Sequence, residues 1–192
     1  MPRKKQYNKE EVTEKAMGVF WNHGYKATSM RMLEAEMGIN LYSIYADFKS
    51  KEGVFLESLR RYRQLNKEVI LRRLLESDGD LLDIRTFFME FVHSVKTGKT
   101  PNGCLFANTA MEIGATDVRI KEQLDLFFTL LKEAYVNLLT KAKALKQFKT
   151  DAPINKYANY LVGITEGISV IAKVLEEDKL TDYIDTAMEA LK

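Results

Sequence analysis

A short run of outward-facing apolar and aromatic side chains, followed by two lysines, offers the clearest chemistry in this sequence. In residues 41–48, LYSIYADF, Ile44 and Phe48 recur four apart, as they do on the buried side of a helix. That spacing turns the rest of the run outward, although much of it is too apolar for a surface that meets only water: Leu41, Tyr42, Tyr45 and Ala46. Lys49 and Lys51 follow, where ammonium groups can pair with phosphates. The pattern indicates a binding surface.

Catalytic and metal-binding patterns are scarce. The two histidines, His23 and His93, lie far apart, and with the one cysteine, Cys104, they give no spacing typical of a metal site. The sequence has no GxSxG, no P-loop and no GxGxxG after a strand. We therefore predict no catalytic residue, no metal and no cofactor. A helical-bundle enzyme with an unrecognised site stays as an alternative, which absence of DNA binding at low salt would favour.

The segment before residue 41 has the signals of a short helix that ends at a glycine. Thr28 or Ser29 can cap its N-terminus. The apolar residues that follow recur at helical spacing, which places Glu34 and Glu36 on the outer side. Gly38 ends this helix, because glycine readily takes the left-handed conformation of a C-terminal turn.

Two further helices complete the arrangement. Asn40 caps residues 41–48, and Ser50 caps a third helix whose first turn contains Glu52, at the positive end of the helix dipole. A helix, a glycine turn and a helix form a helix-turn-helix, whose second helix enters the major groove of DNA. The alternative is an ordinary helical hairpin, since short capped helices are common.

Composition sets the broad class. The chain has 192 residues, of which 46% are hydrophobic and 29% charged, which suits a protein with a sizeable core. The net charge is only +2, so DNA binding must depend on a local patch. A single cysteine fits a reducing cytoplasm, and we find no run long enough to cross a membrane and no apolar segment typical of a signal peptide. We expect a cytoplasmic protein.

The chain starts with a basic tail that has two interpretations. Arg3, Lys4 and Lys5 can be a solubilising terminus, or a flexible arm that adds phosphate contacts or reaches a minor groove. The remaining periodicity predicts helices throughout, over residues 8–24, 51–77, 81–95, 104–113, 120–145, 154–175 and 180–191.

Several separate pieces of the first quarter of the chain occur in the order and at the spacing of a known family. They resemble the DNA-binding domain of the TetR/AcrR transcriptional regulators: Gly24-Tyr25, Thr28-Ser29, Gly38-Ile39-Asn40, Ile44-Tyr45 and Phe48-Lys49-Ser50-Lys51-Glu52. The resemblance implies an all-α fold. In it, residues 1–52 form a three-helix helix-turn-helix domain, and residues 53–192 form a larger helical domain for ligand binding and dimerisation.

The same resemblance implies the residues that face DNA. By matching positions, the phosphate contacts are Ser29, Tyr45 and Lys51, and the base-reading positions are Met30, Arg31, Leu41, Tyr42 and Ala46. Thr28, Ser43 and Lys49 complete the predicted DNA-facing set. Two features depart from the commoner family pattern. Leu41 and Tyr42 replace small or polar residues, which favours contact with thymine methyl groups, and Asp47 must pair with Lys51 or accept a cytosine amino group.

The ligand pocket and the dimer interface are predicted in the second domain. An apolar pocket has these candidate lining residues, each of which has simple core packing as its alternative: Phe87, Phe91, Cys104, Phe106, Asn108, Met111, Phe127 and Tyr135. The resemblance implies that the last two helices pair with their symmetry mates. On them, an apolar stripe with two glycines for close approach predicts the interface: Leu161, Gly163, Ile164, Gly167, Ile168 and Ile171.

These features together predict a dimeric transcriptional repressor with double-stranded operator DNA and a small apolar or reactive effector as its partners. Cys104 begins a helix whose dipole can stabilise a thiolate, with Lys173 as a candidate neighbour, so the thiol is either a sensor of oxidants or electrophiles or an inert core residue. DNA binding without a ligand switch is the remaining alternative.

Overall fold

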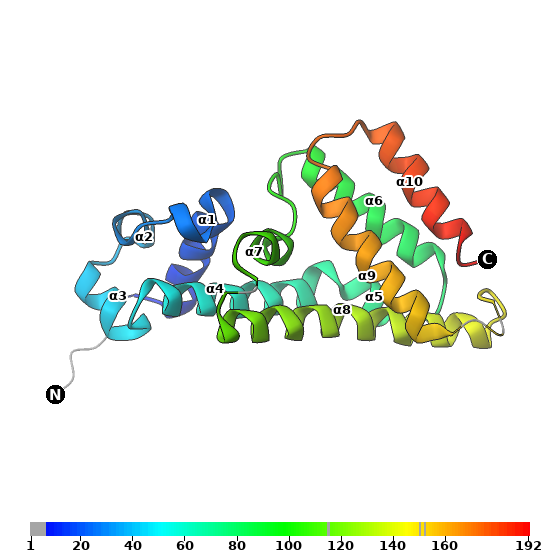
Figure 1. The fold of residues 1–192 in the computed structure, drawn as a ribbon, viewed down its shortest axis with the longest axis horizontal. Helices are drawn as coiled ribbons and strands as arrows, with labels where there is room; N and C mark the ends of the chain where they lie inside the picture. The colour runs from blue at the N-terminus through cyan, green and yellow to red at the C-terminus, as the bar shows by residue number, and fades with distance from the viewer. Residues whose placement is uncertain (1–6, 115, 150, 152) are drawn as a thin grey trace. The chain divides into compact units, whose positions relative to one another are not determined.

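The computed structural model describes residues 7–114, 116–149, 151 and 153–192, and within these ranges every regular element is helical (Figure 1). This confirms the predicted all-α class. The helices are α1 (Lys9–Ala27), α2 (Met30–Met37), α3 (Leu41–Phe48), α4 (Lys51–Leu65), the π-helical turn η1 (Asn66–Ile70), α5 (Arg72–Glu76), α6 (Leu82–Lys96), α7 (Leu105–Ile113), α8 (Val118–Ala144), α9 (Ile154–Ile171) and α10 (Glu177–Glu189).

The predicted helix over residues 51–77 is interrupted. The Leu71 N–H donates to the Asn66 carbonyl five residues earlier, at 2.7 Å, so one extra residue is inserted into the turn. Such an insertion rotates the apolar face of the helix. It lets Tyr62 on one side of the insertion and Leu74 on the other both be buried, which a regular 3.6-residue period over the whole segment does not predict.

The chain divides into two compact units. Unit 1 comprises residues 1–65 and 108–124, and unit 2 comprises residues 66–107 and 125–192. This division differs from the boundary after residue 52 that the motif suggested, because a second, distant segment belongs to the first unit. Helices α7 and α8 each begin in one unit and end in the other.

The core of unit 1 joins α1 to α2 and α4. Phe20 of α1 meets Phe55 of α4 edge to face, with ring centroids 4.7 Å apart, and Tyr25 lies 4.9 Å from the same ring. Leu33 of α2 and Ile44 of α3 are completely buried. Each such apolar side chain stabilises the fold by roughly 1.5–3 kcal/mol. This burial fixes the side of α2 and α3 that stays exposed.

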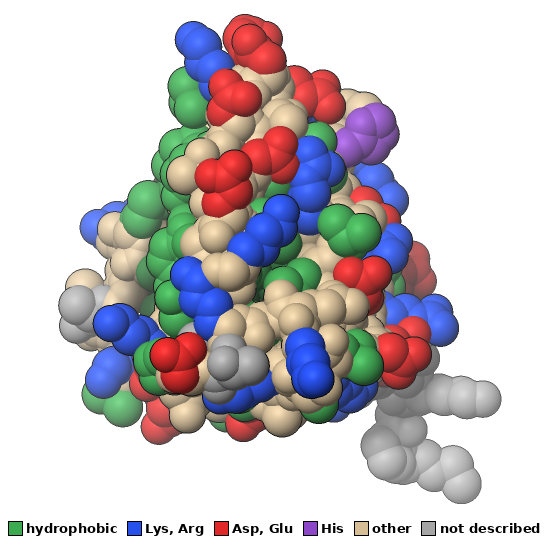
Figure 2. Space-filling view, turned by 90° about the vertical axis from the view of Figure 1, so that its right-hand side faces the viewer, with side chains coloured by type: hydrophobic (Ala, Val, Ile, Leu, Met, Phe, Trp, Pro, Cys, Tyr) green, Lys and Arg blue, Asp and Glu red, His purple; other side chains and the backbone are tan. Residues whose placement is uncertain are grey.

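Unit 2 has a continuous apolar core built from α5, α6, α8, α9 and α10. Tyr135 of α8 is its largest fully buried side chain, and its hydroxyl lies 2.7 Å from the hydroxyl of Thr165 on α9. The end of the molecule seen in Figure 2 carries basic and acidic side chains intermixed, beside a strip of apolar ones. In the described part of the chain, no helix has both the length and the apolar character that crossing a bilayer requires.

Candidate nucleic-acid interface

The predicted helix-turn-helix is present, and both ends of α2 and the start of α3 are capped by the residues that the sequence suggested. Ser29 caps α2, with its hydroxyl accepting from the Met32 N–H at 3.2 Å. Gly38 ends the helix in the left-handed conformation, with φ of 68°. Asn40 then caps α3 by accepting from the Ser43 N–H at 2.9 Å. These bonds satisfy backbone groups that a helix end leaves without partners.

Glu34 has a role that the sequence did not reveal. Although we expected it to face outward, its Oε1 accepts the Leu41 N–H at 2.8 Å. Leu41 is the first residue of α3, and its N–H has no partner inside the helix. The carboxylate therefore caps α3 from α2 and holds the two helices of the motif together.

The outer face of α3 is apolar and exposed. Tyr42 is 84% exposed and Tyr45 is 48% exposed, with Ala46 also exposed. Ile44 and Phe48 are buried, as the four-residue spacing predicted. Two exposed tyrosines on one short helix are unusual for a surface that meets only water, and both carry a hydroxyl that can reach a phosphate or a base.

The remaining predicted DNA-facing residues have differing surroundings. Ser29, Arg31 and Lys49 are exposed, whereas Met30, Leu41 and Ser43 are half-buried. Thr28 is a correction, because its side chain is only 2% exposed and its hydroxyl donates to the Gly24 carbonyl at 2.6 Å. A residue buried in this way has no side-chain group for DNA. Arg3, Lys4 and Lys5 lie outside the described residues.

Lys51 is held inside unit 1. Its ammonium donates to the carbonyls of Tyr25, at 3.0 Å, and Thr28, at 2.9 Å, and lies 4.4 Å from the centre of the Tyr25 ring. An ammonium has three N–H donors, so one is left for a phosphate. Lys51 thus has a structural role in joining α4 to the chain between α1 and α2.

The same short segment is held from its other side by Glu112 of α7. The Glu112 carboxylate accepts from the N–H of Tyr25 at 2.8 Å and from the N–H of Lys26 at 2.7 Å. These N–H groups are available because Gly24 breaks the helix, with φ of 78° and ψ of 170°. Hydrogen bonds to an ionised group are roughly twice as strong as neutral ones. Glu112 and Lys51 therefore fix the approach to α2.

Replacing Gly24 by alanine should destabilise the protein by about 1–3 kcal/mol, because only glycine takes this backbone region without strain. The added Cβ would also lie 2.8 Å from Oε2 of Glu112. Urea unfolding measures the effect. Gly18→Ala in the same helix is the matched control, since a Cβ there meets nothing within 4 Å and alanine is favoured in helices. Equal stability of the two variants would show that Gly24 carries no conformational role.

Other charged groups near the motif are engaged within unit 1. Asp47 accepts the Tyr7 hydroxyl at 2.9 Å; burial and this contact raise the pKa of Tyr7. The three arginines of α4 also have partners, with Arg60 on Glu57, Arg61 on Glu14 and Arg63 on Gln123. These side-chain contacts support the helices of unit 1.

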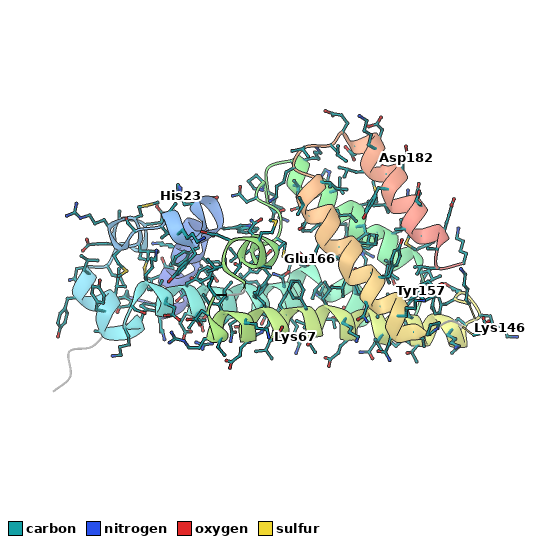
Figure 3. All side chains as sticks on the ribbon, viewed as in Figure 1. His23, Lys67, Lys146, Tyr157, Glu166 and Asp182 are labelled. Atoms are coloured by element: carbon teal, nitrogen blue, oxygen red, sulfur yellow. The ribbon has the colours of Figure 1, made fainter. Side chains whose placement is uncertain are left out.

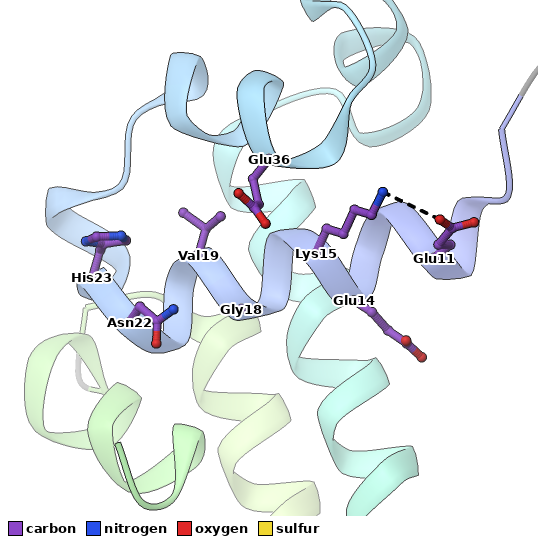
Figure 4. A pocket seen from close by; sticks show the side chains of 8 residues that line it. All are labelled: Glu11, Glu14, Lys15, Gly18, Val19, Asn22, His23 and Glu36. Atoms are coloured by element: carbon purple, nitrogen blue, oxygen red, sulfur yellow. Dashed lines mark ion pairs between the residues drawn. The ribbon is translucent and has the colours of Figure 1, made fainter. Parts of the chain in front are cut away.

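A surface hollow of about 500 Å³ lies along α1 (Figure 4). Its lining includes three carboxylates, Glu11, Glu14 and Glu36, against one lysine, Lys15, which pairs with Glu11 at 3.5 Å. An excess of negative charge repels phosphate. The hollow is therefore unsuited to DNA, which leaves α3 as the candidate surface.

The predicted pocket residues have differing surroundings within the unit to which each belongs. Phe87 and Tyr135 are buried in the core of unit 2, and Phe91 packs against it. Phe106 stacks on Phe127, with centroids 4.2 Å apart and planes 14° from parallel. The two other candidates, Asn108 and Met111, belong to unit 1, and Met111 is 64% exposed. Exposure at that level is greater than expected for a residue that lines an apolar pocket between helices.

Cys104 is buried, immediately before α7, and its neighbour is a residue that the sequence did not single out. The thiol hydrogen-bonds the Glu166 carboxyl of α9. Burial raises the pKa of Glu166 to about 7, and the bond to Cys104 opposes that rise. An ionised carboxylate beside a thiol disfavours the thiolate. Lys173 is exposed, and its Cε lies 3.0 Å from where a Cβ on Gly103 would be.

The predicted interface stripe on α9 needs correction. Leu161, Ile164 and Ile168 are buried in the chain's own core, and Ile171 packs against it. The buried side chains of Leu161, Ile164 and Ile168 are therefore not available to a second chain, whereas Ile171 is half-buried. The surface-facing residues recur at spacings of three and four on another side of α9, and the stripe continues into the turn after the helix: Tyr160, Gly163, Gly167, Val170 and, in the turn, Val174. Both glycines of the prediction lie on this stripe.

Comparison with known proteins gives matches over both parts of the chain. Residues 81–189, more than half of the sequence, match the profile described as "Tetracyclin repressor-like, C-terminal domain". Residues 12–58 match the profile described as "Bacterial regulatory proteins, tetR family". The second match contains the helix-turn-helix described above.

Individual relatives are similar over most or all of their length. The chain is 27% identical to YezE, an uncharacterized HTH-type transcriptional regulator of Bacillus subtilis, with 100% of both chains covered. It is 24% identical to the HTH-type transcriptional repressor ComR of Escherichia coli, over 89% of this chain and 82% of that one. Among solved structures, a cysteine mutant of the TetR family regulator CifR, complexed with 26-base-pair double-strand operator DNA, has a TM-score of 0.86 at 23% identity, covering 98% and 99% of the chains. The structural match supports the fold.

Proposed function

The chain belongs to the TetR family of bacterial transcriptional regulators. On that basis we propose that it is a repressor that binds a pseudo-palindromic operator as a homodimer. We propose further that it leaves the operator when a small molecule binds. The family is one of DNA-binding regulators, so the alternative of a helical-bundle enzyme is set aside. Two relatives, ComR of Escherichia coli and AcnR of Corynebacterium diphtheriae, are named as repressors. Their names support repression over activation for this chain.

The exposed face of α3 is the observation that supports DNA reading most directly. Tyr42 and Tyr45 stand on a helix that is capped at its start and anchored by two buried residues, so its outer face is presented rigidly. Phosphate contacts position such a helix, and contacts with base edges select the sequence. We assign positioning to Tyr45 and base reading to Tyr42.

The proposed dimer uses the surface stripe of α9 together with α10. Val174 is 76% exposed, and Val170 and Tyr160 are partly exposed. Tyr183 of α10 adjoins this stripe, because its hydroxyl lies 3.2 Å from the position of a Cβ on Gly167. Apolar groups gathered on one helix face, with glycines between them, suit close packing against an identical helix.

The proposed ligand response uses the continuity of α7. Its first residues, 105–107, belong to unit 2, and its remaining residues belong to unit 1. Cys104 and Glu166 adjoin its start, and Glu112 near its end holds the chain that leads to α2. A helix that a ligand displaces at one end can change the position of the other.

Removing one hydroxyl should separate the two proposed roles on α3. Tyr45→Phe should weaken operator binding roughly tenfold, and equally on all sequences, because each of two subunits loses one hydrogen bond to phosphate. Tyr42→Ala should instead change the preferred sequence. Both are measured by fluorescence anisotropy on the selected operator and on variants with single base changes. Unaltered affinity and preference in both variants would refute the assignment of α3 as the reading helix.

A further inference from the structure

Glu166 is a buried carboxyl group without a counter-charge. Both of its oxygens are shielded from water, and neither has an N–H or O–H partner among the described residues. Figure 3 labels it on α9. An unpaired buried carboxylate is costly, so such a group in a protein is either neutralised by a proton or meets a donor. Among the described residues, the contact recorded for this carboxyl is with the Cys104 thiol, which is a weak donor and carries no positive charge.

Three hydroxyl groups on α8 and α9 donate to partners other than the Glu166 carboxyl. Thr165 donates to the Leu161 carbonyl at 2.8 Å, so the Tyr135 hydroxyl must donate to Thr165, and its proton is used. Ser169 donates to the backbone carbonyl of Glu166, at 2.9 Å, and not to its carboxylate. The Cys104 thiol, which does contact the carboxyl, is a weak donor.

The chain that follows Cys104, the residue in contact with Glu166, is apolar and buried. Phe106 is completely buried, and its stacking partner Phe127 is only 3% exposed. Apolar walls around one charged group are typical of a site that binds an apolar body with a single polar end. The sign of the charge then decides the class of ligand, because a carboxylate complements a cation.

We propose that unit 2 binds a protonated amine with an apolar body, and that Glu166 is its counter-ion. The proposal deepens the proposed ligand response and depends on it only for the effect on DNA. The ammonium would supply the missing donor and a positive charge at once. An alcohol of the same shape would supply a donor without the charge, and a carboxylic acid would bring a second negative charge.

The test compares two probes of the same shape, 4-phenylbutylamine and 4-phenylbutan-1-ol, by calorimetric titration of the full chain. We expect the amine to bind at least tenfold more tightly than the alcohol at pH 8. The preference should disappear in Glu166→Gln and persist in Glu133→Gln, which makes the same change at an exposed position of α8. Amine affinity should fall about tenfold from pH 8 to pH 6, because a carboxyl with a pKa of about 7 is then mostly protonated.

Three results would overturn the proposal: no amine binding at millimolar concentration, equal binding of amine and alcohol, or a preference that survives in Glu166→Gln. A cooperative thermal unfolding transition of Glu166→Gln, like that of the wild type, would show that the core of the variant is intact. Operator affinity of the same preparations is measured without probe. If the wild type binds operator but shows no amine preference, only the ligand class is wrong. If the amine preference holds and no operator is bound, the proposed function fails instead.

Discussion

Gly163→Leu should convert the proposed dimer to monomers and weaken operator binding by about 10²- to 10⁴-fold. In the single chain a Cβ at Gly163 meets nothing within 4 Å, so leucine can be accommodated without internal overlap. Against an identical helix it overpacks the contact, at a cost of about 1–3 kcal/mol at each of two symmetric positions. The loss of DNA affinity follows because two linked reading heads bind as one unit and separate heads do not.

Analytical ultracentrifugation at micromolar concentration measures the first effect, and anisotropy on the operator measures the second. Gly18→Leu in α1 is a matched control, since it is also a helical glycine with open space beside it but lies outside the stripe. Gly167→Leu is a poorer choice, because its Cβ would already meet Tyr183 of the same chain. A dimeric Gly163→Leu with full affinity would place the interface elsewhere.

Glu166→Gln should stabilise the protein by up to about 3 kcal/mol at pH 8 and change little at pH 5. The folded state raises the pKa of Glu166 from its ordinary value of 4.5 to about 7, so it holds the proton more tightly than the unfolded chain does. Stability from this group is therefore complete below about pH 4.5 and is lost as pH rises through 7. Each pKa unit corresponds to about 1.4 kcal/mol.

Urea unfolding of wild type and variant at equal protein concentration, from pH 5 to pH 8, measures this difference. Other titrating groups affect both proteins alike, so the difference between them reports Glu166. Glu133→Gln, at an exposed site, should follow the wild-type profile. If the free energies of unfolding of wild type and Glu166→Gln changed in parallel with pH, the Glu166 carboxyl would have an ordinary pKa. The carboxyl would then be either exposed to water or paired.

The local parts of the DNA-binding motif could be predicted from the sequence because local rules govern them. Ser29, Gly38 and Asn40 act as caps through bonds to residues no more than four positions away. The burial of Ile44 and Phe48 follows from the helical period alone. Residues close in sequence determine where a helix begins, where it ends and which of its sides is buried.

Contacts between distant segments could not be predicted in the same way. Glu112 binds the Tyr25 N–H across 87 positions of sequence, and nothing in a helix pattern identifies that partner. Glu166 looks like any acidic residue of an amphipathic helix until the packing of α9 against Cys104 is known. The apolar stripe at Leu161 and Ile168 has the same periodicity whether it meets its own core or a second chain, which explains the wrong choice of face.

Selection of binding sites from random duplex DNA tests the central claim most directly. Wild-type protein should enrich one sequence with two inverted half-sites, whose centres lie about 34 Å apart or a multiple of it, because a two-fold dimer presents two identical reading helices. Footprinting on that sequence should protect both halves together. Enrichment of no sequence, or of a single unsymmetric half-site bound with full affinity, would contradict a dimeric operator-binding regulator.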